Sequence, residues 1–121
     1  MLNILYVDDD PNMQKMVELF MRKSRNTLTV AKNGRSALKL LEKNLYDIII
    51  TDIQMPELDG LALIDEIKKR KIETPVVIVS AFGQESISQK GLKKGAAKIL
   101  RKPFESKELF ETIEKISKRG R

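Results

Sequence analysis

The residues in this sequence best suited to chemistry are acidic, and they follow two short apolar runs. Asp8 and Asp9 come directly after Ile4–Val7, and Asp52 comes directly after Asp47–Thr51. If both runs are strands of one parallel sheet, the carboxylates meet beyond its carboxyl edge, where ligands bind in such folds. Grouped carboxylates repel one another, so they must either shift their pKa values or bind a cation.

Oxygen ligands without nitrogen or sulfur favour a hard cation, so Mg²⁺ is the cofactor that we expect. The chain contains no cysteine and no histidine, which excludes disulfides, zinc–thiolate sites and thiol catalysis and removes the commonest general base. A simpler interpretation is that Asp8 and Asp9 only cap the following helix. Asp10, immediately before Pro11, is already placed for capping, which leaves the other two carboxylates unexplained without an ion.

Asp52 is the candidate nucleophile, because a carboxylate can attack phosphorus and form an acyl phosphate. We expect an ordinary low pKa that keeps Asp52 ionised, with the metal offsetting charge on the phosphoryl oxygens. Ser80 follows Val76–Val79 and can donate a hydrogen bond to a phosphoryl oxygen, and Lys102 follows Ala97–Leu100 and supplies a positive charge. Taken alone, Ser80 could be a strand-end cap and Lys102 a surface lysine.

The elements that position these residues alternate along the chain. Five short apolar runs, the second at Leu28–Ala31, are separated by stretches with helical periodicity. Three of the runs are rich in Ile and Val, as in strands buried on both faces of a parallel sheet. This order predicts an α/β fold, a doubly wound five-stranded parallel sheet of flavodoxin-like (βα)5 topology. The length of 121 residues fits one domain with one core.

The fourth helical segment, Gln84–Lys94, is the weakest. It offers only Ile87 and Leu92 as sizeable apolar side chains, and Gly91 lowers its helix propensity. We expect it to be the most mobile cover on the sheet, which suits a switch, although a loose surface helix would have the same pattern. By contrast, the second helical stretch has a clear apolar stripe, which is predicted to extend to Leu45.

Together, these motifs resemble the receiver domain of two-component response regulators. The matching segments, which occur in the family's order along the whole chain, are Val7-Asp8-Asp9, Asp52-Ile53-Gln54-Met55-Pro56 with Asp59-Gly60, Val79-Ser80-Ala81 and Lys102-Pro103-Phe104.

The resemblance assigns roles to several of the matching positions. It implies that Asp52 is the phosphoacceptor, and that Asp9, Asp52 and the Gln54 carbonyl hold Mg²⁺, with Asp8 helping through water. Ser80 and Lys102 would bind the phosphoryl group. The lysine–proline bond of the family is usually cis, so we expect the same of the bond to Pro103.

Two positions should tune the switch. The family often has an aromatic ring three residues before the lysine, and this chain has Ile99 there, so we expect switching to depend more on the weak fourth helix and its preceding loop. Gln54 and Phe82 lie two residues past Asp52 and Ser80, beside the path of a hydrolytic water. A bulky Phe82 predicts a long-lived phosphoryl state; alternatively, it only packs on the loop.

The resemblance also implies partners, namely a histidine kinase or phosphotransfer protein as donor and a downstream protein as target. We expect residues 1–121 to be a single receiver domain without an output domain.

The net charge of +6 arises in residues 83–121, which hold 11 basic and 5 acidic side chains. The stretch has few aromatic residues for base stacking, so a solvated lysine-rich surface is favoured over direct nucleic-acid binding. No membrane span or signal peptide is apparent, which indicates a cytoplasmic protein.

Three other functions compete with this one. A flavin or dinucleotide site needs a first loop that accepts phosphate, whereas Asp8, Asp9 and Asp10 would repel it. A phosphatase of the haloacid dehalogenase type normally has a second acid two residues after its nucleophile, where this chain has Gln54. We therefore expect an acceptor that catalyses its own phosphorylation and slow dephosphorylation, not an enzyme acting on outside substrates. A degenerate receiver that only binds partners is the remaining alternative.

Overall fold

The computed structural model describes residues 1–119, so the last basic residue of the chain, Arg121, lies outside the described part. Strands and helices alternate throughout. The elements are β1 (Asn3–Val7), α1 (Pro11–Arg22), β2 (Thr27–Ala31), α2 (Gly34–Lys43), β3 (Ile48–Asp52), α3 (Gly60–Lys69), β4 (Val76–Ser80), α4 (Glu85–Lys93), β5 (Lys98–Arg101) and α5 (Ser106–Arg119). None of the helices in residues 1–119 is long and apolar enough to cross a bilayer.

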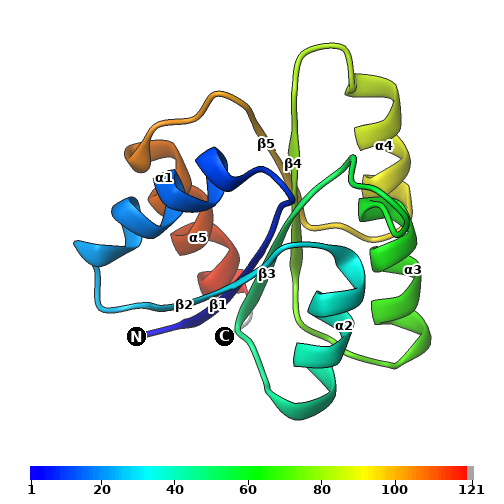
Figure 1. Ribbon diagram of the computed structural model, residues 1–121, viewed down its shortest axis with the longest axis horizontal. Helices are drawn as coiled ribbons and strands as arrows, with labels where there is room; N and C mark the ends of the chain where they lie inside the picture. The colour runs from blue at the N-terminus through cyan, green and yellow to red at the C-terminus, as the bar shows by residue number, and fades with distance from the viewer. Residues whose placement is uncertain (120–121) are drawn as a thin grey trace.

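The strands form one parallel sheet in the order β2-β1-β3-β4-β5, which confirms the predicted doubly wound fold. Helices α1 and α5 cover one face, and α2, α3 and α4 cover the other (Figure 1). The chain runs from β1 outward to β2 and then crosses to β3 on the other side of β1. Such a reversal opens a crevice at the carboxyl ends of the two strands, where ligands bind in folds of this type.

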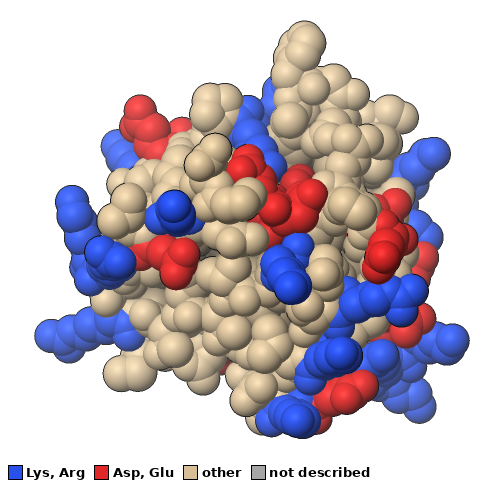
Figure 2. Space-filling model, viewed as in Figure 1, with Lys and Arg blue, Asp and Glu red and all other residues tan. Residues whose placement is uncertain are grey.

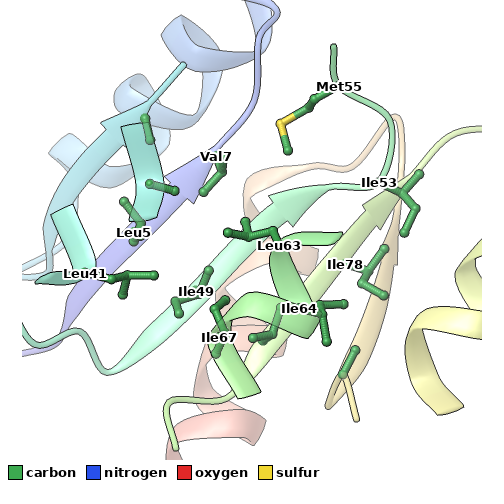
Figure 3. Close-up of a cluster of buried hydrophobic side chains, with 14 residues drawn as sticks. Leu5, Val7, Leu41, Ile49, Ile53, Met55, Leu63, Ile64, Ile67 and Ile78 are labelled. Atoms are coloured by element: carbon green, nitrogen blue, oxygen red, sulfur yellow. The ribbon is translucent and has the colours of Figure 1, made fainter. Parts of the chain in front are cut away.

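Each face of the sheet has its own apolar layer. Under α2, α3 and α4, Leu63, Ile64 and Ile67 of α3 point toward strand residues such as Ile49 and Ile78 (Figure 3). On the opposite face, α1 and α5 bury a second cluster of apolar side chains against the strands. Every residue of β3 and β4 is buried. This explains why these two strands read as unbroken apolar runs in the sequence.

Two details differ from the sequence-based expectation. Asp52 and Ser80 are the last residues of β3 and β4 and do not follow them, so strand pairing fixes the main chain of both residues. Helix α2 ends at Lys43, and Leu45 lies beyond it with 90% of its surface exposed. The apolar stripe predicted to reach Leu45 was therefore too long.

The small side chains of α4 have a packing reason. Gly91 is buried, and a Cβ at this position would collide with Cδ1 of Ile78 on β4. The glycine lowers helix propensity, but it lets the helix approach the sheet closely. Ile87 and Leu92 are only partly buried against the core, which agrees with the limited apolar surface of this segment.

Candidate functional site

Three carboxylates converge at the carboxyl ends of β1 and β3. Asp8, Asp9 and Asp52 each offer an oxygen atom, and these atoms lie within 4.8 Å of one another. The convergence follows from strand pairing, since Val7 of β1 is in register with Thr51 of β3. Asp8 and Asp52 are buried, while Asp9 is exposed. Figure 2 shows acidic side chains gathered over this end of the sheet, near the top centre of the view.

Asp8 is completely buried and is held by several donors. The Tyr6 hydroxyl donates to its Oδ2 at 2.7 Å, and the main-chain N–H of Asp10 donates to its Oδ1 at 3.0 Å. Gln14 Nε2 donates to its main-chain carbonyl at 2.7 Å. Tyr6 was not among the site residues predicted from the sequence. The spacing could have indicated the contact, because residues two apart on a strand point toward the same face. A tyrosine within an apolar run is, however, usually interpreted as a core residue.

Lys102 lies across from the carboxylates. Its Nζ is 3.3 Å from Asp52 Oδ2 and 3.4 Å from Asp8 Oδ2. The main-chain N–H of Lys102 donates to the Ser80 carbonyl at 2.8 Å, and the peptide bond to Pro103 is cis, as expected. The side chain is only 19% exposed. Lys102 is therefore no ordinary surface lysine, because its ammonium bridges two buried acids.

The electrostatics correct one expectation. Burial, and then the nearby charge of Asp8, raise the pKa of Asp52 from 3.8 to about 6, although the Lys102 ammonium acts in the opposite direction. The predicted ordinary low pKa was therefore wrong for the metal-free protein. Burial and the hydrogen bond to Asp8 raise the pKa of Tyr6, so its hydroxyl stays protonated and remains a donor. Three acids against one ammonium leave the cluster with excess negative charge, which a bound divalent cation would offset.

The donor set fits a hard divalent ion. All three side-chain ligands available within residues 1–119 are carboxylate oxygens, and such ligands suit Mg²⁺, which typically takes one or two carboxylates together with waters and phosphate oxygens. Asp10 does not belong to this set. Its side chain accepts a hydrogen bond from the Asn12 N–H at 2.9 Å and caps α1, which confirms the assignment of capping to Asp10.

The loop after β3 is folded tightly against the site. The Gly60 N–H donates to the Ile53 carbonyl at 3.0 Å, and a Cβ on Gly60 would lie 2.6 Å from the Asp52 carbonyl oxygen. Only glycine fits at this contact. Gln54, two residues after Asp52, has an exposed side chain whose Oε1 accepts a hydrogen bond from Gln84 Nε2 at 2.8 Å. No signal in the sequence pointed to Gln84.

Phe82 lies in the loop between β4 and α4, and its side chain is 91% exposed. The alternative interpretation, in which the ring packs on its own loop, is therefore wrong. An aromatic ring so close in sequence to Ser80 is available to an approaching molecule, and its shielding of a hydrolytic water stays a prediction.

Ser80 and Ile99 share a cavity of about 240 Å³ between α4 and the strands β4 and β5. Glu85 and Arg101, which form an ion pair at 2.8 Å, also line it. The Ser88 hydroxyl, buried in the same place, has no hydrogen-bond partner within the described residues.

Comparison with known proteins agrees with this geometry. The chain is 34% identical over 119 residues to the chemotaxis protein CheY of Listeria monocytogenes, covering 98% of this chain and 100% of that protein. It is 38% identical over 110 residues to the two-component response regulator ARR11 of Arabidopsis thaliana, but that match covers 89% of this chain and only 21% of the plant protein. The chain thus spans about a fifth of the length of that relative.

Solved structures give the same result. The receiver domain of the Francisella response regulator 1452 superposes with a TM-score of 0.91 at 35% identity and covers 100% of both chains. The profile described as the response regulator receiver domain matches residues 4–114. By sequence and by structure, this chain belongs to the response regulator receiver domain family.

Proposed function

We propose that this domain is a phosphorylation-activated signalling switch. It accepts a phosphoryl group on Asp52, with Mg²⁺, from a histidine of a kinase or phosphotransfer protein. The observation that carries the proposal is the arrangement of Asp8, Asp9 and Asp52 within 4.8 Å of one another, with the Lys102 ammonium 3.3 Å from Asp52. A nucleophilic carboxylate beside an acidic metal site, with a cation at hand, is suited to phosphoryl transfer.

The chemistry divides among the residues as follows. An oxygen of the ionised Asp52 carboxylate forms a bond to phosphorus while the bond from phosphorus to the donor nitrogen breaks. Lys102 and the Ser80 hydroxyl bind phosphoryl oxygens. Asp9, Asp52 and the Gln54 carbonyl would hold Mg²⁺, with Asp8 acting through water; when bound, the ion neutralises charge on the phosphoryl oxygens. Lys102 also favours the ionised form of Asp52 against the effect of burial.

The decisive experiment is incubation with acetyl phosphate and Mg²⁺ followed by intact-mass measurement, with Asp52→Asn as the control. We expect wild-type protein to gain one phosphoryl group, and the variant to gain none. Wild-type protein that never gains the group would instead be a degenerate receiver that only binds partners. Continuous phosphate release without a covalent adduct would indicate a phosphatase.

We further propose that the signal leaves by protein contact. Within residues 1–119, most of the basic excess of the last third of the chain lies on α4, β5 and α5, where Lys98, Lys107 and Lys115 are found. This surface favours an acidic downstream protein, because opposite charge steers association. Pull-downs with phosphorylated and unphosphorylated protein at two salt concentrations test this. A target whose capture is unaffected by phosphorylation would contradict the proposal.

A further inference from the structure

The side chain of Gln84 connects two loops beside the acceptor carboxylate. Gln84 occupies the N-cap position of α4, but its side chain makes no capping hydrogen bond. By contrast, the N-cap side chains of α1, α2 and α3 (Asp10, Asn33 and Asp59) each accept a hydrogen bond from the first turn of their helix. Instead, its Oε1 accepts from the Ala81 N–H at 2.7 Å. Its Nε2 donates to Gln54 Oε1 at 2.8 Å. One amide group therefore joins the β4–α4 loop to the β3–α3 loop.

The Gln84 bridge lies beside the residues that we propose bind the phosphoryl group. Gln54 lies two residues after Asp52, and Ala81 lies directly after Ser80, at the ends of two neighbouring strands in which Asp52 is in register with Val79. The Ala81 N–H is thus a main-chain donor next to the hydroxyl that we propose binds the phosphoryl group. Main-chain N–H groups at such turns bind anionic oxygens well. In this structure, the amide oxygen of Gln84 already occupies this donor.

We propose that Gln84 is a positioning residue that acts as an amide latch on the site. The latch consists of the Gln84 side chain, the Ala81 N–H and the Gln54 side chain. While closed, it withholds the Ala81 N–H and ties the two loops together. A phosphoryl group arriving on Asp52 competes with the Gln84 amide oxygen for that donor, so the latch slows phosphorylation. This inference rests on the proposed function.

The latch also links the site to α4. The Gln84 carbonyl accepts from the Ser88 N–H at 2.9 Å in the first turn of the helix, and the next residue, Glu85, pairs with Arg101 of β5 at 2.8 Å. Displacement of Gln84 therefore acts directly on the first turn of α4. This is a contact by which a helix with little apolar anchoring can respond to the state of Asp52.

The latch predicts a measurable kinetic effect. Each hydrogen bond of this kind contributes about 0.5–1.5 kcal/mol, which corresponds to about a 2- to 10-fold change in rate. We expect Gln84→Ala to be phosphorylated by acetyl phosphate and Mg²⁺ about 2- to 10-fold faster than wild type. Gln54→Ala should also be faster, because the same bridge is broken while the main-chain carbonyl of residue 54 is retained. Ser86→Ala, at an exposed position of the same helix, is the control and should match wild type.

A double-mutant cycle distinguishes a latch from a general loosening of the loop. If Gln54 and Gln84 act through their mutual hydrogen bond, the double variant should be no faster than the faster single variant. Independent, multiplying effects would contradict a shared latch. Rates of Gln84→Ala equal to those of wild type would overturn the inference.

A second readout does not need phosphorylation. Hydrogen exchange of the Ala81 amide should be slower in wild type than in Gln84→Ala, because the side chain protects it only when the latch is closed. Equal exchange would overturn the latch even if Asp52 is phosphorylated. Wild-type protein that never gains a phosphoryl group would overturn the proposed function and the gating role that rests on it, while slower wild-type exchange would still support the contact.

Discussion

The buried charge of Asp52 should make the metal-free protein less stable at neutral pH than Asp52→Asn. Burial and the charge of Asp8 raise the pKa of this carboxyl from 3.8 to about 6. Each pKa unit corresponds to about 1.4 kcal/mol, so ionised Asp52 destabilises the fold by about 3 kcal/mol above pH 6. The attraction of Lys102 is already included in this shift. Asparagine keeps the shape without the charge, and Lys102 retains Asp8 as a partner at 3.4 Å.

The sign of the pH dependence follows from proton binding. Below about pH 4, Asp52 is protonated in the folded and unfolded chains alike, so its pKa shift contributes no penalty. Between about pH 4 and 6 the folded protein holds the proton more tightly than the unfolded chain, so the contribution of Asp52 to stability falls as the pH rises. The stability advantage of Asp52→Asn should therefore be small near pH 4 and grow to about 3 kcal/mol at pH 7.

The assay is urea unfolding followed by circular dichroism in the presence of a chelator, at several pH values between about 4 and 7. Adding Mg²⁺ should stabilise wild type more than the variant, because the ion offsets the charge that the variant lacks. Glu73→Gln, which removes an exposed acid outside the carboxylate cluster, controls for net charge. An advantage of Asp52→Asn that is absent, or equal at all pH values, would refute the reasoning.

The remaining predictions concern individual side chains. Phe82→Ala should shorten the lifetime of phosphorylated protein several-fold if the exposed ring hinders a hydrolytic water. The loss of the phosphoryl group is followed by intact mass, and an unchanged rate of loss would contradict the shielding hypothesis. Gly60→Ala should lower the free energy of unfolding by about 1–3 kcal/mol, because the new Cβ meets the Asp52 carbonyl oxygen at 2.6 Å; unfolding titration measures this. Ser88→Ala should raise stability by about 1 kcal/mol by removing a buried hydroxyl without a partner among the described residues. Ser24→Ala, which removes a hydroxyl that donates to the Met21 carbonyl at 2.9 Å, should lower stability in the same assay.

Local pattern was enough to predict the architecture. Strand and helix periodicities depend on neighbours a few residues apart, so the order of the elements and the parallel sheet could be derived from the sequence. The ends of the elements were less certain, as Leu45 illustrates, because a helix stops where capping and packing stop and not where the apolar residues do. The expectation that Asp8 and Asp52 meet at one edge needed only the rule that parallel strands end together.

What the sequence alone determined is therefore the set of elements and the kinds of side chain at the carboxyl ends of the strands. Tertiary structure decided the rest, because distance, burial and competing partners exist only once the strands are paired. The raised pKa of Asp52 comes from burial and from Asp8, 44 positions earlier. The hydrogen bond between Gln54 and Gln84 joins residues 30 positions apart, and no local pattern predicts that contact. Long-range contacts of this kind depend on the packing of the whole sheet, so they can be found only in the folded molecule.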